Sequence, residues 1–178
     1  EGANIVITGR NKQKLEDAKE ELERLFGVKV LALQADISAG TDNAAIAKSV
    51  AEQTVEAFGS IDVLINNAGG ALKMPLGGFE KMPMDYWISQ VNLNLNSAAF
   101  LSHYAMQNMI ENHIEGAIIN VSSVHGTIPW VRRKTLPYAA AKAGLNMFTK
   151  NLGIEAIHYG INVNGIAPGF ITTKATDR

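Results

Sequence analysis

The stretch IDVLINNAG, residues 61–69, places a short apolar run directly before a polar turn that contains glycine. The run over 61–66 is typical of a buried strand, because it is short and apolar and ends at polar residues. Runs of this kind alternate with longer segments of helical periodicity along the chain. We expect strands over 4–8, 28–35, 61–66, 117–123 and 161–167, and helices over 11–26, 41–58, 83–113 and 137–159.

This alternation predicts an α/β fold with a doubly wound parallel sheet of the Rossmann type. The chain has 178 residues, which fits one domain, and it contains no repeat or linker. We therefore expect a single domain over residues 1–178. Capping signals support the first helix, with Asn11 as its N-cap and Gly27 as its end.

The composition excludes several functional classes. Apolar residues make up 47% of the chain and charged residues 19%, which excludes a disordered protein. A formal net charge of −1 provides no global field for nucleic acid or an anionic membrane. Cysteine is absent, and the four histidines lack metal-ligand spacing, so we expect no metal site. No apolar run has the length of a membrane span, and we expect a cytoplasmic protein.

Polar or glycine-bearing turns follow all five expected strands. In chain order they read GRN, DIS, NNAG, SSVHG and PGFITT. Ligands of an open parallel sheet bind beyond the carboxyl ends of its strands. The five turns should therefore meet at one edge of the sheet and form the binding site.

The segment YAAAK (138–142) places Tyr138 and Lys142 four residues apart in an expected helix. Residues at this spacing lie on one helix face, and the small residues between and after them leave that face open to another group. The spacing alone also fits an ordinary surface pair. A free tyrosine is a poor base at neutral pH, but a nearby ammonium favours its phenolate form.

Four ordered motifs together resemble the short-chain dehydrogenase/reductase family, and the resemblance covers essentially the whole chain. The motifs are NNAG (66–69), the serine pair 122–123, YAAAK (138–142) and PGFITT (168–173). The stretch ENHIEGAIINVSSVHGTIPW (111–130) is further similar to bacterial glucose 1-dehydrogenases of this family. YAAAKAGL and APGFI are equally similar to 3-oxoacyl-carrier-protein reductases.

The resemblance implies an oxidoreductase that transfers a hydride between a nicotinamide cofactor and a secondary alcohol or carbonyl. A sugar such as glucose is the first substrate class, and a 3-oxoacyl thioester is the alternative. A non-catalytic nucleotide-binding relative is the alternative from another class. Retention of all four family catalytic residues favours an enzyme over that relative.

Those four residues are Ser123, Tyr138, Lys142 and Asn94. By the resemblance, Tyr138 exchanges the proton of the substrate oxygen, Ser123 hydrogen-bonds that oxygen, and Lys142 supports both Tyr138 and the cofactor ribose. Asn94 would interrupt its helix and hold a water molecule of a proton relay, although Asn92 and Asn96 compete for the role. The loop between Ser123 and Tyr138 is two residues longer than usual in the family.

The resemblance also implies a set of cofactor contacts. Asp36 and Ile37 would meet the adenine, Asn67, Ala68 and Gly69 the adenosine ribose, and Tyr138 and Lys142 the nicotinamide ribose. The nicotinamide carboxamide would be covered by Pro168, Gly169, Ile171 and Thr173.

Arg10 favours NADP(H) over NAD(H). Gly9 occupies the place where the resemblance expects the acidic residue that binds a free ribose 2′-hydroxyl, and Arg10 follows it. A guanidinium without a competing carboxylate at that place suits a 2′-phosphate. The alternative is an exposed arginine that merely precedes a helix.

Two expectations concern the wider assembly. The resemblance implies a further strand, a glycine-rich loop and a helix before residue 1, and a further segment after PGFITT, so we expect the fold to be incomplete at both ends. The missing strand would lie between 4–8 and 61–66, which predicts that these two strands do not pair. A homotetramer is implied through helices near 97–113 and 137–159, with apolar faces at Phe100, Tyr104 and Met109, and at Leu145, Phe148 and Leu152.

Overall fold

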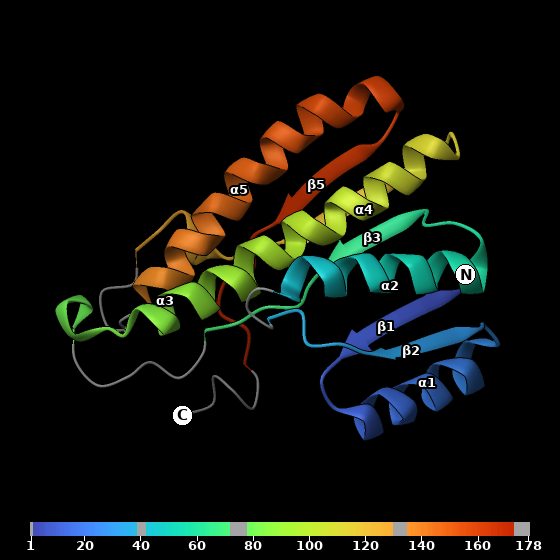
Figure 1. Ribbon diagram of the computed structural model, residues 1–178, viewed down its shortest axis with the longest axis horizontal. Coiled ribbons are helices and arrows are strands. Elements are labelled where there is room, and N and C mark those ends of the chain that lie inside the picture. Colours follow the sequence, from blue (N-terminus) through green and yellow to red (C-terminus); the bar gives the residue numbers. More distant parts are fainter. Residues whose placement is uncertain (1, 39–41, 72–77, 130–134, 173–178) are drawn as a thin grey trace.

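The computed structural model describes residues 2–38, 42–71, 78–129 and 135–172. Within these ranges the strands and helices alternate as the sequence predicts (Figure 1). The strands are β1 (Ile5–Gly9), β2 (Val30–Gln34), β3 (Val63–Asn66), β4 (Ala117–Val121) and β5 (Asn162–Ile166). The α-helices are α1 (Lys12–Phe26), α2 (Asn43–Phe58), α3 (Met84–Val91), α4 (Ser97–Glu111) and α5 (Leu136–Ala156). The shorter helical turns are η2 (Phe79–Lys81), η3 (Asn92–Asn96), η4 (Val124–Gly126) and η5 (Ile157–Tyr159).

The strands form two parallel sheets, β1–β2 and β3–β4–β5. The arrows of β1, β2, β3 and β5 point to the same side of the molecule (Figure 1), so their carboxyl ends share one edge. Among the described residues β1 is hydrogen-bonded to β2 and not to β3, which confirms the prediction that these two strands do not pair.

Local signals set the ends of the first helix as expected. The Asn11 side chain accepts a hydrogen bond from the backbone N–H of Lys14 and so caps the start of α1. Gly27 ends the helix at a φ of 63°, in the left-handed region that glycine adopts without a Cβ clash. Leu15 of α1 is buried and packs against Gly9 at the end of β1.

Helices α4 and α5 cover one face of the β3–β4–β5 sheet, and α2 packs against α4. The core between them includes the fully buried Met109 of α4 and Ile118 of β4. Alternate residues point to the other face, where Val63, Ile65 and Ile166 are more than half exposed. The side chains that face the helices include buried asparagines at the ends of β3 and β4, which bear on the site below.

The expected helix over 83–113 is interrupted by a π-helical turn. Helix α3 ends at Val91, η3 follows with one wider turn, and α4 begins at Ser97. An inserted residue in a helix creates such a bulge, and bulges of this type frequently lie at functional sites. No helix in the described part of the chain is long and apolar enough to cross a membrane.

Candidate active site

Three hydrogen bonds join the carboxyl end of β4 to the end of β5 and to α5. Two of them connect backbone groups, and the third is donated by a side chain. The N–H of Ser122 donates to the oxygen of Ile166 at 2.7 Å, and the N–H of Val124 donates to the oxygen of Pro168 at 3.0 Å. The Ser122 hydroxyl donates to the backbone oxygen of Lys142 at 3.1 Å. The predicted segments SSVHG, YAAAK and PGF therefore meet at one place.

Ser123 lies where these three segments meet, and its side chain is buried. Its backbone is extended, and its Oγ accepts a hydrogen bond from the N–H of His125 at 3.2 Å, which caps the short helix η4. This bond uses a lone pair of the hydroxyl and leaves its proton for another acceptor. A substrate oxygen is such an acceptor, as expected for the predicted serine.

Lys142 is buried on the first turns of α5, and its Nζ donates to the backbone oxygen of Val121 at 2.7 Å. Burial disfavours the charged form and lowers the pKa of Lys142 to about 8. The Nζ lies 5.9 Å from the centre of the Tyr138 ring, one helical turn away. The two residues of YAAAK thus share one face of α5, and this face is directed to the sheet edge.

Asn94 is the asparagine of η3 that reaches the site. Its Oδ1 accepts from the N–H of Gly70 at 2.8 Å, and its Nδ2 donates to the oxygen of Gly70 at 3.1 Å and to that of Gln90 at 3.0 Å. These bonds clamp the turn after β3 onto the helix. Asn92 and Asn96 instead bond to each other at 2.8 Å, whereas Asn94 bonds to the turn at Gly70.

Gly69 lies where the clamp and the lysine converge. A Cβ added at this position would lie 2.9 Å from the Oδ1 of Asn94 and 3.2 Å from the Nζ of Lys142. Contacts this short are avoided in proteins, so only glycine lets the turn lie this close to Asn94 and to the ammonium. A ribose offers hydroxyls that both donate and accept, and the exposed turn beside the ammonium provides partners for such a group.

The adenine-side residues lie at the ends of β1 and β2. The Ser38 hydroxyl and N–H both donate to the Asp36 carboxylate, and the hydroxyl bond is the main cause of the lowered pKa of this group. The Arg10 guanidinium contributes in the same direction, so Arg10 and Asp36 are electrostatic neighbours. Ile37 buries its side chain, which leaves its backbone for the expected contact.

The remaining predicted contacts follow β3 and β5. Asn67 and Ala68 are exposed in the turn between β3 and the clamped Gly70. Pro168 is held by its bond to Val124, and Gly169 and Ile171 are exposed beyond it. The last residue of the predicted set, Thr173, lies outside the described residues.

Gly126 and Gln90 are site residues that sequence reasoning missed. A Cβ on Gly126 would lie 2.8 Å from the backbone of Lys142, so this glycine lets η4 pack directly on α5. Its sequence signal was the glycine of SSVHG. Gln90 is fully buried and its backbone oxygen accepts from Asn94, but nothing in its local sequence pattern distinguishes it from a surface residue of α3.

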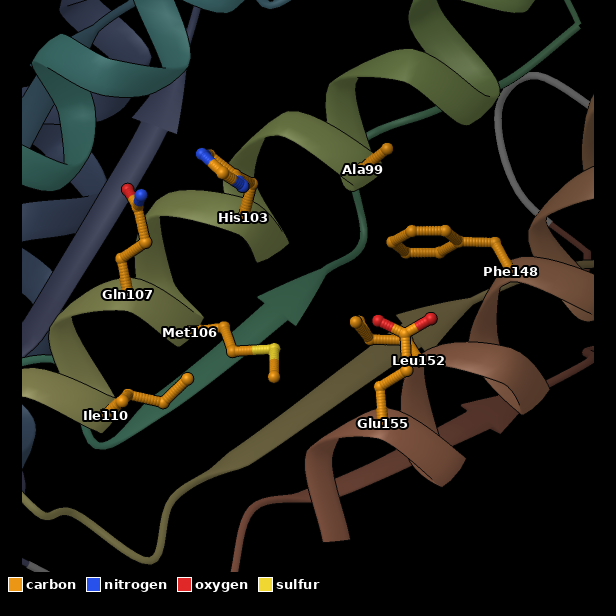
Figure 2. Close-up of a pocket in the computed structure, with 8 residues that line it drawn as sticks. All are labelled: Ala99, His103, Met106, Gln107, Ile110, Phe148, Leu152 and Glu155. Carbon is orange, nitrogen blue, oxygen red and sulfur yellow. The ribbon is translucent and has the colours of Figure 1, made fainter. Parts of the chain in front are cut away.

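A separate hollow lies between α4 and α5, away from the catalytic residues (Figure 2). Asn94 precedes α4, and Tyr138 and Lys142 begin α5, whereas the hollow lies further along both helices. Most of its lining is apolar, with polar groups at its margins: Ala99, His103, Met106, Gln107, Ile110, Phe148, Leu152 and Glu155.

The chain is similar to known proteins over nearly its whole length. The family model described as short chain dehydrogenase matches residues 1–178. A 12alpha-hydroxysteroid dehydrogenase from a Clostridium species is 37% identical over 98% of this chain, and glucose 1-dehydrogenase 2 of Bacillus subtilis is 30% identical over 98%. The chain spans about 65% of the length of each of these relatives. The crystal structure of acetoin dehydrogenase from Enterobacter cloacae superposes with a TM-score of 0.85 at 32% identity, covering 98% of this chain and 66% of that one.

Proposed function

The chain belongs to the short-chain dehydrogenase family, and we propose that the full-length protein oxidises a secondary alcohol, or reduces the matching carbonyl, with NADP(H) favoured over NAD(H). The observation that carries this proposal is the convergence at Gly69. Asn94 and Lys142 come from helices far apart in sequence, and both approach the backbone of this glycine so closely that a Cβ would not fit.

Each catalytic residue has a distinct role in the proposed reaction. The nicotinamide ring, when bound, supplies the hydride acceptor for oxidation and the donor for reduction. Tyr138 takes the proton of the substrate hydroxyl in oxidation and returns it in reduction. Ser123 donates its free proton to the substrate oxygen and orients it.

Lys142 has two roles in this proposal. Its ammonium is anchored to Val121 and lies on the same helix face as Tyr138, 5.9 Å from the centre of that ring, where its charge faces the proton-transferring residue. The same ammonium binds ribose hydroxyls in the space beside Gly69. Asn94 fixes the turn at Gly70, so that the backbone lining this space keeps its shape.

NADP(H) is favoured through Arg10. Arg10 is exposed beyond the end of β1, and Gly9 at that strand end carries no carboxylate to repel a 2′-phosphate. Asp36 is held by Ser38 and is only a weaker neighbour of Arg10. The guanidinium therefore keeps donors for a phosphate.

A sugar such as glucose remains the first substrate class, followed by a 3-oxoacyl thioester. One observation favours another alcohol. His125, two residues after Ser123, stacks edge-to-face on Phe170 at 5.8 Å, and both Phe170 and Ile128 are more than half exposed. Apolar surface beside the reacting oxygen suits an alcohol with an apolar body, such as the hydroxysteroid named for one relative.

The same protein should assemble as a homotetramer through α4 and α5. The hollow in Figure 2 exposes Met106, Ile110 and Phe148 on neighbouring helices, and a second copy of this apolar surface would cover it. The faces differ from those expected. Met109 and Leu145 are fully buried within the protomer, because they point to the sheet and not outward.

The proposed function is tested by following the absorbance of the reduced nicotinamide cofactor in reactions that contain the full-length protein. The buffer reproduces the cytoplasmic conditions expected for it. The panel contains sugars and polyols, a 3-oxoacyl thioester and hydroxysteroids, each with both dinucleotides. Turnover identifies the substrate class. Dinucleotide binding without turnover on any compound supports the non-catalytic relative, and the absence of both overturns the proposal.

A further inference from the structure

A row of four buried polar side chains crosses the protein beneath the candidate active site. Asn66 Nδ2 donates to the Ser102 Oγ at 3.0 Å and to the Asn120 Oδ1 at 2.8 Å. Asn120 Nδ2 donates to the Thr149 Oγ1 at 3.0 Å, and this hydroxyl donates to the backbone oxygen of Leu145 at 2.7 Å. The row therefore joins α4, β3, β4 and α5 in the part of the core that lies between the sheet and its helices.

Three members of the row lie on elements that carry or lead into candidate site residues. Asn66 is the last residue of β3 and directly precedes the Asn67–Gly70 turn. Asn120 directly precedes Val121, whose oxygen anchors the Lys142 ammonium. Thr149 lies two helical turns after Lys142 on α5, so its bond to Asn120 holds that helix against β4.

Asn66 and Asn120 are also partners in the parallel register of β3 and β4. A slip of either strand by one residue would turn its asparagine to the opposite face of the sheet. The buried amide of the other would then lose its bond to that asparagine. The row therefore favours one register of β3 and β4, and one position of α5, over the registers and positions one residue away.

Stability alone does not account for these residues. Asn66 Oδ1 is buried and has no partner among the described residues, which is unfavourable in a core. Apolar side chains of similar size would pack in the same layer without this loss. Buried polar groups of this kind can serve to specify one arrangement at the expense of stability.

We propose that Asn120 is a positioning residue of the active site. By bonding to Asn66 and to Thr149, Asn120 fixes the positions of β3 and α5 relative to β4. It thereby fixes the positions of the Asn67–Gly70 turn and of the Lys142 ammonium relative to Ser123. Asn120 touches neither substrate nor cofactor. The proposal rests on the proposed function for its effect on turnover, but the bonds themselves can be tested without turnover.

The decisive variants change Thr149, because valine and serine at this position separate the effect of side-chain shape from the effect of hydrogen bonding. Thr149→Val keeps the branched shape and removes the hydroxyl, whereas Thr149→Ser keeps the hydroxyl. Thr54→Val is the matched control, since Thr54 makes the same 2.7 Å bond to the backbone oxygen four residues earlier, on α2, and belongs to no such row. All three are made in the full-length protein together with Asn120→Leu.

The first readout is the side-chain amide of Asn120 in nuclear magnetic resonance spectra, assigned by its loss in Asn120→Leu. We expect slow hydrogen exchange of this amide in the wild type and Thr149→Ser, and fast exchange in Thr149→Val. Fast exchange in the wild type, or slow exchange in Thr149→Val, would overturn the proposal, whether or not the protein turns over any substrate.

The second readout is the split between kcat and KM with the best substrate. We expect Thr149→Val to lower kcat by about ten- to a hundredfold, because small displacements of reacting groups have effects of that size. KM should change less, Thr149→Ser should recover most of the rate, and Thr54→Val should match the wild type. Equal kcat in Thr149→Val and Thr54→Val would contradict a positioning role and reduce the row to a structural one.

Discussion

The Nζ of Lys142 lies 2.7 Å from the backbone oxygen of Val121, which ties the buried ammonium of α5 to the last residue of β4. One residue further on, the Ser122 hydroxyl donates back to the backbone oxygen of Lys142 at 3.1 Å. This reciprocal contact brings the YAAAK helix and the serine pair into one site. The predictions below probe that site and the surfaces around it.

Replacing Tyr138 by phenylalanine should lower kcat by about a hundred- to ten-thousandfold, the usual contribution of a general acid or base. The fold should be unaffected, because only the hydroxyl is lost. Steady-state kinetics and a melting curve check both statements. Tyr159→Phe is the control, since Tyr159 is half exposed in η5, far along the chain from the site. Wild-type turnover in Tyr138→Phe would remove Tyr138 from the mechanism.

The buried Lys142 should make stability depend on pH in a defined window. Its folded-state pKa of about 8 lies below the ordinary lysine value of 10.5, so between these pH values the unfolded chain binds a proton that the folded chain does not. The contribution of Lys142 to the free energy of unfolding should therefore rise as pH increases from about 8 to about 10.5.

Denaturant unfolding of the wild type and Lys142→Met, without cofactor, measures this contribution. The stability of Lys142→Met relative to the wild type should be greatest below pH 8 and should fall by about 1.4 kcal/mol per pKa unit of the shift as pH rises through the window. A constant difference between the two proteins over that range would show that Lys142 is not perturbed by burial. Lys142→Met should also reduce turnover and cofactor affinity.

Gly69→Ala should weaken cofactor binding and kcat/KM together. The new Cβ would press on the Oδ1 of Asn94 and the Nζ of Lys142, and overpacking of this kind costs about 1–3 kcal/mol. Gly153→Ala, in the interior of α5, is the control, because its Cβ would make only an ordinary contact with Val163 of β5. Titration of the dinucleotide by fluorescence compares the two, and equal affinities would exclude close packing at Gly69.

Arg10→Ala should reduce the preference for NADP over NAD by about tenfold or more, since a hydrogen bond to a charged group contributes about 1.5–3 kcal/mol. Arg24→Ala, in the last turn of α1, removes an exposed arginine of the same helix–strand unit and should have no effect. The measurement is the ratio of the two dissociation constants. If the wild type binds both dinucleotides equally and Arg10→Ala changes neither, the cofactor proposal is wrong.

Phe148→Ser should weaken the proposed tetramer. The substitution removes an aromatic ring from the hollow between α4 and α5 and leaves the catalytic turns of α5 in place. Light scattering over a range of protein concentrations should show a tetramer for the wild type and smaller species for the variant. A monomeric wild type would contradict the assembly.

Local structure could be predicted because its causes lie within a few residues. Asn11 begins α1 and Gly27 ends it, through backbone hydrogen bonds and φ angles that depend only on the nearest turn. The shared face of Tyr138 and Lys142 follows from the helical period. The strand order that the family resemblance implies predicted that β1 and β3 would not pair.

The sequence by itself therefore determined the α/β alternation and the strand-end location of the candidate site, and the resemblance of its motifs named Ser123, Tyr138 and Lys142 as candidate members. Tertiary structure decided which side each helix presents. It directed the amide of Asn94, one of three asparagines in η3, to Gly70, and it turned Met109 and Leu145 inward. It also aligned Asn66, Asn120 and Thr149, which lie far apart in sequence. Such contacts depend on the packing of whole elements against one another, and no local period or cap in the sequence encodes that packing.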